Sequence, residues 1–266
     1  MIKIAVFGAN GRMGKVLCEA SLSAQYAQLS TALVRESNVL IGQPVGPVIG
    51  CRDTEVAFAS EKSLNSDVDV AIDFTLPEGM KAHLALAIKQ RVPMVIGTTG
   101  LSDEEMSTLK DAAQYIPIVF SRNYSVGINL LENLVQVAAK TLSEDIDIEI
   151  FEAHHRHKID APSGTALMIG EAIAKAKGWD HAEVAKFDRS QDGGEKSQQE
   201  IGYSVMRGGD IVGEHTAYFA AEGERLELTH KASSRMTFAK GAVRAAAWVK
   251  DKPNGLYTMQ DVLDLH

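Results

Sequence analysis

The stretch KIAVFGANGRMG, residues 3–14, decides the fold of this chain. A short apolar run ends at Gly8, and Gly11 and Gly14 follow directly before an apolar segment with helical spacing. Continuous apolar runs of this length are typical of strands buried on both faces of a sheet. A strand, a glycine-rich turn and a helix in this order predict the first βαβ unit of a parallel sheet.

The same alternation continues through the first half of the chain. Further short apolar runs predict strands over 29–34, 68–74, 94–97 and 116–121. Helical spacing between them predicts helices over 14–24, 80–90 and 102–113, the last opened by a capping box of Ser102 and Glu105. Strands and helices in series predict an α/β Rossmann-type domain with a doubly wound parallel sheet.

The pattern changes after Tyr124. A predicted helix over 127–142 leads into IDIEIFEAHH, residues 146–155, where apolar and charged residues alternate as in a sheet with one wet face. Alternating segments at 201–206, 215–221 and 225–230 have few helices between them, so we predict an α+β domain with a mixed or antiparallel sheet.

The C-terminal part of the chain is expected to return to the first domain. Residues 235–248 are alanine-rich with helical spacing, and we expect this segment to dock there. The predicted domains are therefore residues 1–125 plus 235–266, and residues 126–234. The polar, glycine-containing residues 186–200 show no period and are expected to form a mobile loop.

The composition excludes several classes of protein. The formal net charge is −8, so the chain lacks the broad positive field that nucleic acids or anionic membranes require. No apolar run reaches the ~20 residues that cross a bilayer, and the N-terminus enters a strand without the features of a signal peptide. Cys18 and Cys51 have no zinc-ligand spacing, and we expect both to be buried thiols. We expect a cytoplasmic protein.

The glycine turn predicts a dinucleotide site. Without side chains, backbone N–H groups and the positive end of a helix can approach a pyrophosphate closely. The turn departs from the GxGxxG pattern, because Asn10 stands where the second glycine would fall. The alternative is that these glycines serve only chain reversal and helix packing.

The end of the second predicted strand bears on the choice of cofactor. It reads ALVRE, residues 32–36, so Val34 stands where an acidic residue that binds the ribose of NAD would be expected. Arg35 follows and Arg12 lies in the glycine turn, so two guanidinium groups could hold the 2′-phosphate of NADPH. The alternative is that Arg35 is a solvated charge and Glu36 takes the acid's role.

Three loops of small and hydroxyl residues follow other predicted strands. They are DFTLP (73–77), GTTG (97–100) and SRNYS (121–125). Ligands bind at the carboxyl ends of the strands in parallel sheets, so together these loops predict a crevice for the nicotinamide.

Protonatable side chains concentrate in EAHHRHKIDAPSGTA, residues 152–166. A zinc site is one interpretation, but Arg156 and Lys158 would repel a dication, so we predict no metal. A solvated basic turn is another. The residues that follow favour a third, because Ser163 is a good N-cap and a helix N-terminus binds anions through its free N–H groups. Basic side chains beside it predict a carboxylate pocket with imidazole and ammonium groups as proton donors.

These motifs together resemble the 4-hydroxy-tetrahydrodipicolinate reductase (dihydrodipicolinate reductase) family over essentially the whole chain. The segment 152–166 carries most of the resemblance. It implies a Rossmann-type cofactor domain completed by the C-terminal segment, and an α+β domain that binds a small dicarboxylate and builds a homotetramer. It also implies reduction, with NADPH or NADH, of 4-hydroxy-tetrahydrodipicolinate to tetrahydrodipicolinate in the diaminopimelate route of lysine biosynthesis.

The resemblance further implies roles for individual residues. His154 would be the proton donor or acceptor and Lys158 the proton donor. The substrate would be held by His155, Ser163, Gly164 and Thr165. The cofactor would be held by Gly8, Ala9, Asn10, Gly11, Arg12, Met13, Val34, Arg35, Gly97, Thr98, Thr99, Ser121, Arg122, Asn123 and Tyr124. Val34 departs from the family, whose members often carry an acid there.

Two alternative functions stay open. One is a Rossmann oxidoreductase acting on another small anionic substrate, which would not specifically require the basic run beside residues 160–165. The other is a regulator that senses NADPH without turnover. A sensor has no need of a positioned proton donor such as Lys158 with His154.

Overall fold

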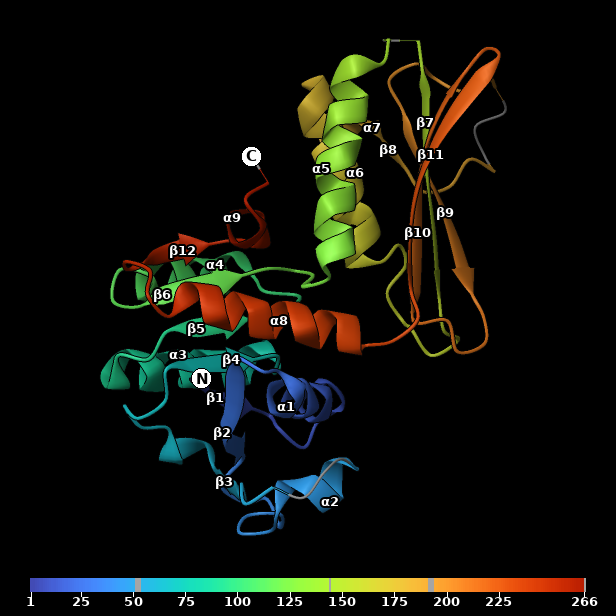
Figure 1. The fold of residues 1–266 in the computed structure, drawn as a ribbon. Helices are drawn as coiled ribbons and strands as arrows, with labels where there is room; N and C mark the ends of the chain where they lie inside the picture. The colour runs from blue at the N-terminus through green and yellow to red at the C-terminus, as the bar shows by residue number, and fades with distance from the viewer. Residues whose placement is uncertain (51–53, 144, 191–193, 266) are drawn as a thin grey trace. The chain divides into compact units, whose positions relative to one another are not determined.

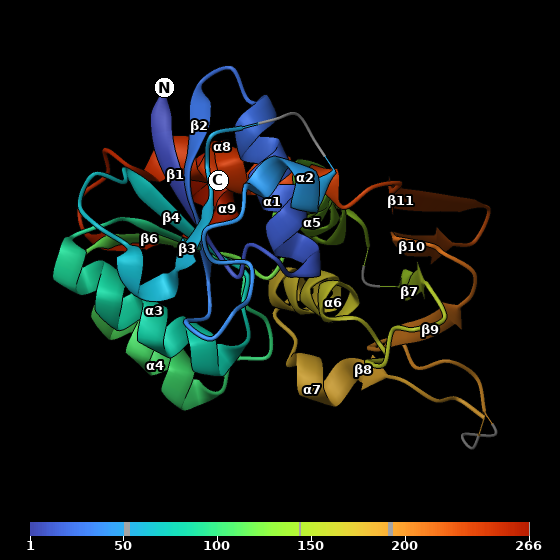
Figure 2. The ribbon, with the colours of Figure 1, turned by 90° about the horizontal axis from the view of Figure 1, so that it is seen from below.

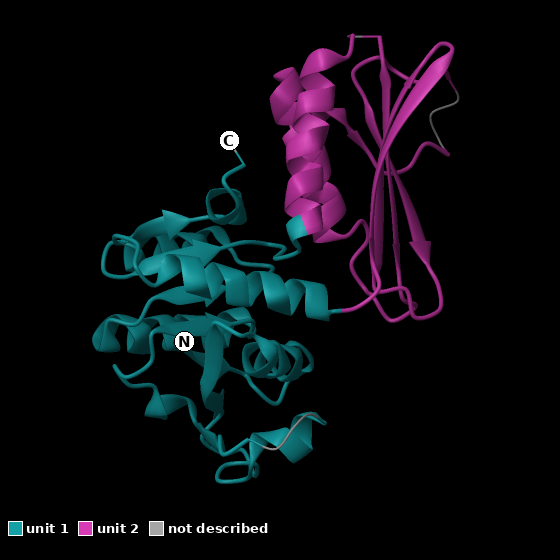
Figure 3. Ribbon diagram, in the orientation of Figure 1, with its two compact units in different colours: residues 1–126, 235–266 teal, residues 127–234 magenta. Residues whose placement is uncertain are grey.

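The computed structural model describes residues 1–50, 54–143, 145–190 and 194–265, so Cys51 and part of the expected loop, residues 191–193, lie outside the described residues. The chain divides into two compact units, shown in Figure 3. Unit 1 comprises Met1–Val126 and Arg235–His266, and unit 2 comprises Gly127–Ser234. In the described parts of the chain, no helix has the length and apolar character needed to cross a membrane.

Unit 1 is built on a seven-stranded sheet in the order β12-β6-β5-β4-β1-β2-β3 (Figure 1). All of its strand pairs are parallel. The strands are β1 (Ile2–Phe7), β2 (Ala27–Val34), β3 (Phe58–Ser60), β4 (Val70–Asp73), β5 (Met94–Ile96), β6 (Pro117–Phe120) and β12 (Gly255–Tyr257). The predicted Rossmann-type parallel sheet is confirmed.

Helices cover both faces of this sheet, as Figure 2 shows. One face carries α1 (Arg12–Ser23), α8 (Met236–Val249) and α9 (Met259–Leu263), and their apolar side chains share one core with β1 and β2. The other face carries α3 (Pro77–Gln90) and α4 (Asp103–Ala112) over a second core. The capping box of Ser102 and Glu105 is present at the start of α4. The short elements α2 (Val45–Ile49) and η1 (Glu61–Ser63) flank β3.

Unit 2 is an α+β unit with a five-stranded sheet in the order β11-β10-β7-β9-β8. The strands are β7 (Asp147–His154), β8 (Ala185–Lys186), β9 (Ile201–Arg207), β10 (Gly213–Ala221) and β11 (Glu224–Ala232). The sheet is mixed, because β7 pairs parallel with β9 and antiparallel with β10. The helices are α5 (Val126–Thr141), α6 (Gly164–Lys177) and α7 (His181–Val184).

The alternation of β7 explains how unit 2 forms its core. Ile146, Ile148 and Ile150 are buried in one cluster with α5 and α6, whereas Asp147, between the first two, is exposed. Apolar side chains of both helices, such as Leu131 and Ile169, complete this cluster. Burying this face offsets the entropy lost when the chain orders.

Several short elements have no sequence prediction. They are α2, β3, η1, α7, β8, β12 and α9, none longer than five residues. Such elements contain too few residues to display a period, and pairing with a longer neighbour forms them instead. β12 adds to the sheet edge beside β6 in this way, and β8 adds beside β9.

Candidate functional site

The glycine turn after β1 and the start of α1 border a cavity. Gly8 has a positive φ of 61°, which favours glycine. A Cβ on Gly14 would lie 2.0 Å from the carbonyl oxygen of Gly8, so the helix packs directly on the turn. The first N–H groups of α1 and the positive end of its dipole are therefore accessible to an anion.

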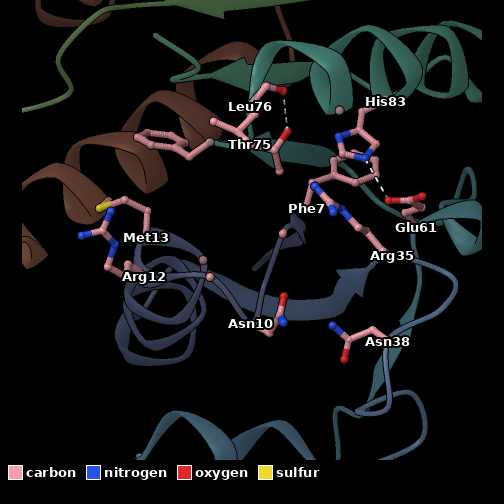
Figure 4. Close-up of a pocket in the computed structure, with 15 residues that line it drawn as sticks. Phe7, Asn10, Arg12, Met13, Arg35, Asn38, Glu61, Thr75, Leu76 and His83 are labelled. Carbon is pink, nitrogen blue, oxygen red and sulfur yellow. Dashed lines mark hydrogen bonds and ion pairs between the residues drawn. The ribbon is translucent and has the colours of Figure 1, made fainter. Parts of the chain in front are cut away.

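A cavity of about 470 Å³ lies over this turn (Figure 4). Predicted cofactor residues that line it are Gly8, Asn10, Gly11, Arg12, Met13 and Arg35. In Figure 4, Arg12 and Met13 lie on one side of the cavity, and Arg35, Asn38, Glu61 and His83 lie on the other. Ala9 and Val34 are buried in the core and do not line the cavity.

His83, in one wall of the cavity, pairs with a buried carboxylate that does not itself line the cavity. Asp73, at the end of β4, accepts hydrogen bonds from the N–H and the hydroxyl of Thr75 at 2.8 and 2.6 Å. Its other oxygen lies 2.7 Å from Nδ1 of His83, whose Nε2 lies 3.3 Å from Glu61. The ring of Phe7 stacks on His83 with 3.9 Å between centroids. Burial lowers the pKa of His83, but hydrogen bonds with Asp73 and Glu61 outweigh it and leave the pKa raised.

Of the three predicted nicotinamide loops, 73–77 lines this cavity through Phe74, Thr75 and Leu76, and the other two do not. These two hold Gly97, Thr98, Thr99, Ser121, Arg122, Asn123 and Tyr124. The hydroxyl of Thr98 is buried without a hydrogen-bond partner among the described residues. The hydroxyl of Tyr124 lies 2.9 Å from the carbonyl oxygens of Ile96 and Val119, so this side chain belongs to the core. Burial raises the pKa of Tyr124 well above its ordinary value.

The histidine-rich segment follows β7 in unit 2. His154 is the last residue of that strand, its side chain is 12% exposed, and its Nδ1 lies 2.6 Å from Glu152. Lys158 donates to both carboxylate oxygens of Asp160 at 2.8 Å. The structure therefore gives each predicted catalytic side chain an acidic partner.

Glu152 lies at the centre of this arrangement and is 1% exposed. Arg207 binds it through two nitrogens, at 2.8 and 2.7 Å, and the backbone N–H of Ser163 donates to it at 2.9 Å. Burial raises the pKa of Glu152, but hydrogen bonds from His154 and Arg207 outweigh it and lower the pKa to about 2. Glu152 is therefore ionised at neutral pH.

The start of α6 is capped as predicted. The hydroxyl of Ser163 accepts from the N–H of Ala166 at 3.1 Å and lies 2.9 Å from Nε2 of His215. Burial lowers the pKa of His215 to about 3, so this imidazole is neutral. A Cβ on Gly164 would meet nothing within 4 Å, so the first turn of α6 borders open space. The side chain of Ser163 serves the helix, and its role towards substrate stays a prediction.

The sequence analysis did not select several residues that build these two arrangements. They are Asp73, His83 and Glu61 in unit 1, and Glu152, Asp160, Arg207 and His215 in unit 2. Three of them carry a local signal, because Asp73 opens the quoted loop 73–77 and Glu152 and Asp160 lie inside the quoted segment 152–166. Within the described parts of the chain, no group of three or more His, Cys, Asp or Glu residues could hold a metal ion.

Comparison with known families agrees with this arrangement. A family model described as dihydrodipicolinate reductase, N-terminus, matches residues 2–124, and one described as dihydrodipicolinate reductase, C-terminus, matches residues 127–263. The chain belongs to the dihydrodipicolinate reductase family. This confirms the predicted resemblance.

Relatives of this dihydrodipicolinate reductase family member are similar along their whole length. The 4-hydroxy-tetrahydrodipicolinate reductase of Pseudoalteromonas translucida (strain TAC 125) is 65% identical, with 99% of this chain and 98% of its own covered. That of Pseudoalteromonas atlantica (strain T6c / ATCC BAA-1087) is 54% identical, with 100% of both chains covered.

Solved structures share the fold. A dipicolinate-bound dihydrodipicolinate reductase from Paenisporosarcina sp. TG-14 matches with a TM-score of 0.75 and 24% identity, covering 98% of each chain. An amine dehydrogenase from Mycobacterium smegmatis matches with a TM-score of 0.60 and 15% identity, covering 97% of this chain and 95% of its own. At these identities the likeness concerns the fold alone. It supports the predicted pairing of a Rossmann-type domain with an α+β domain.

Proposed function

We propose that this enzyme reduces 4-hydroxy-tetrahydrodipicolinate to tetrahydrodipicolinate with NAD(P)H, in the diaminopimelate route of lysine biosynthesis. Family membership and the names of the full-length relatives support the reaction. The observation that carries it in the structure is the start of α6, which borders open space next to a segment with His154 and Lys158. A dicarboxylate needs such an anion site and a nearby proton donor.

Unit 1 has the features that a dinucleotide requires. The glycine turn after β1 presents backbone N–H groups that can bind a pyrophosphate. The buried hydroxyl of Thr98 is a polar group that a ligand could contact. When bound, the dinucleotide supplies the hydride. We propose contacts from the turn 8–13 and from residues 97–99 and 121–124.

We propose that NADPH is preferred over NADH. The side chain of Val34 is buried and supplies no acid, and Glu36 already pairs with Lys62 at 2.6 Å. Arg35 lines the cavity at the end of β2, where the adenosine ribose binds in such folds. Arg12 lines the opposite side, so Arg35 is the better candidate for the 2′-phosphate.

In unit 2 the chain's own residues bind the substrate and supply the proton. We propose that His155, Gly164 and Thr165 hold its carboxylates, with N–H groups of α6 as donors. The ammonium of Lys158 stabilises the negative charge that develops on the ring and then donates its proton. Before the substrate binds, Asp160 pairs with the side-chain nitrogen of Lys158 at 2.8 Å.

Loss of nicotinamide absorbance tests this function. Substrate is generated in situ from pyruvate and aspartate semialdehyde by the upstream synthase. We expect rapid oxidation of NADPH and slower oxidation of NADH. Lys158→Ala should lower kcat by ~10² or more without changing NADPH affinity. Lys186→Ala, in β8, is the control and should retain wild-type kcat.

The possible outcomes separate the candidate functions. Wild-type turnover by the Lys158→Ala variant would show that Lys158 is not the proton donor. If folded protein binds NADPH but oxidises neither cofactor, the sensor interpretation is favoured instead. Arg35→Ala should reduce the ratio of NADPH to NADH activity, and an unchanged ratio would contradict the role of Arg35.

We also propose that the enzyme is a homotetramer in the cytoplasm. Exposed apolar side chains on the strands of unit 2, such as Val205, Met206 and Leu226, support association through this unit. Light scattering should give a mass of about 115 kDa, four times the 28.7 kDa of one chain. A mass of one chain would contradict the tetramer.

A further inference from the structure

One carboxylate connects three elements of unit 2. One oxygen of Glu152 accepts the N–H of Ser163 at 2.9 Å, and the other lies 2.6 Å from Nδ1 of His154. Arg207, at the end of β9, binds both oxygens. Glu152 thus joins the end of β7, the end of β9 and the start of α6.

Arg207 makes this burial of charge possible. A buried carboxylate without a partner is strongly destabilising, and a bidentate guanidinium–carboxylate contact offsets that penalty. Arg207 also donates to the backbone carbonyl of Asp160 at 2.7 Å, so it holds the loop that carries Lys158. With Arg207 as its counterion, Glu152 remains an acceptor whether or not His154 is protonated.

The two ring nitrogens of His154 have different environments. Nδ1 faces Glu152, which as a carboxylate can only accept, so Nδ1 carries the hydrogen. Nε2 has no hydrogen-bond partner among the described residues. A Cβ on Gly213 would lie 3.1 Å from it, so glycine at this position keeps the space beside Nε2 clear. In the neutral imidazole, Nε2 is therefore the nitrogen with the free lone pair.

We propose that Glu152 is the positioning residue of this site, fixing His154 in the tautomer with hydrogen on Nδ1 while it holds the N-cap of the substrate-binding helix. The inference rests on the proposed reductase function and deepens it. Glu152 contacts both His154, the proposed proton-exchange group, and the N-cap of α6, whose N–H groups are proposed to bind the carboxylates. It therefore fixes the distance between these two parts of the site. Arg207 is the counterion that allows this.

Glu152→Gln tests the proposal, because it keeps the shape and removes the charge. The new amide can donate to Nδ1, which moves the hydrogen of His154 to Nε2. We expect kcat to fall by ~10² or more, with the KM for NADPH nearly unchanged. Glu149→Gln is the matched control, since it lies on the same strand and pairs with Arg189 and Lys196 instead. It should stay within about twofold of wild-type kcat.

The tautomer is measured directly by long-range ¹H–¹⁵N correlation of the imidazole rings at a pH of about 9, where histidine is ordinarily neutral. His154→Gln assigns the signals. Wild type should show hydrogen on Nδ1, and Glu152→Gln should show it on Nε2. A wild-type spectrum with hydrogen on Nε2 overturns the proposal, even if Glu152→Gln fails to fold.

The outcomes distinguish the inference from the function it rests on. If Lys158→Ala loses activity but folded Glu152→Gln retains wild-type kcat, the positioning role is wrong and the reductase function stands. If wild type reduces nothing, the function fails, while the tautomer measurement still decides what Glu152 does to His154.

Discussion

Each unit of this chain buries a carboxylate against a histidine, and the two pairs differ in how their charge is balanced. In unit 1, Asp73 lies 2.7 Å from Nδ1 of His83, and Glu61 approaches the other nitrogen. In unit 2, Glu152 lies 2.6 Å from Nδ1 of His154, and Arg207 binds both oxygens of the carboxylate.

The difference decides which group must carry positive charge. Among the described residues, no arginine or lysine is hydrogen-bonded to Asp73, so the partner that can supply positive charge there is the imidazole of His83, whose pKa is raised. In unit 2 the guanidinium supplies that charge, and His154 need not. In the proposed mechanism, this arginine leaves His154 available for proton exchange.

The largest effect that sharpens this comparison is the acid sensitivity of unit 2. Burial lowers the pKa of His215 from 6.5 to about 3, so the folded state stays neutral while unfolded chains take up a proton. Stability is therefore lost as pH falls from about 6.5 towards 3. His215→Gln cannot titrate. Between pH 7 and pH 4, wild type should lose roughly 3 kcal/mol more free energy of unfolding than this variant.

The chain offers a reporter for each unit. Its two tryptophans are Trp179, in unit 2, and Trp248, in unit 1. Urea unfolding in a Trp248→Phe background, followed by the fluorescence of Trp179, reports unit 2. His157→Gln is the control, because His157 is exposed. Equal losses of the free energy of unfolding between pH 7 and pH 4 in wild type and His215→Gln would show that His215 is not buried as a neutral group.

The sequence predicts the main strands and helices of both units, and the predicted fold class and family are confirmed. The glycine turn, the period of the strands and the caps at Ser102 and Ser163 are local patterns, so a single sequence displays them. The residues that surround the buried Glu152 and Ser163 are distant from them in the sequence. Arg207 stands 55 positions after Glu152, and His215 stands 52 after Ser163. Only the sheet order of unit 2 brings such residues together, since β7 pairs with both β9 and β10.

An intermediate effect on stability is expected for Asp73→Asn, which removes the buried carboxylate that has no arginine partner. Asn keeps the shape and can still accept from Thr75, but it cannot serve as counterion to His83. We expect the free energy of unfolding of unit 1 to fall by about 1–3 kcal/mol at pH 7. The measurement is urea unfolding in a Trp179→Phe background, followed by Trp248.

The control for this change is Asp69→Asn. Asp69 is exposed and accepts one backbone hydrogen bond from Lys3 at 2.7 Å, so the same substitution there should cost clearly less. Equal losses at positions 69 and 73 would mean that the buried pair with His83 contributes nothing particular to unit 1.

The smallest effect is a pH dependence of opposite sign in unit 1. Because the pKa of His83 is raised in the folded state, its contribution is complete below the unfolded value of 6.5 and is lost as pH rises through the folded value. Burial opposes the two hydrogen bonds, so the net contribution is modest. Followed by Trp248, wild-type unit 1 should lose stability as the pH rises above about 6.5, and His83→Gln should remove that slope. If unit 1 instead gains stability as pH rises, His83 is not the counterion of Asp73, and the contrast with the arginine-balanced pair of unit 2 fails.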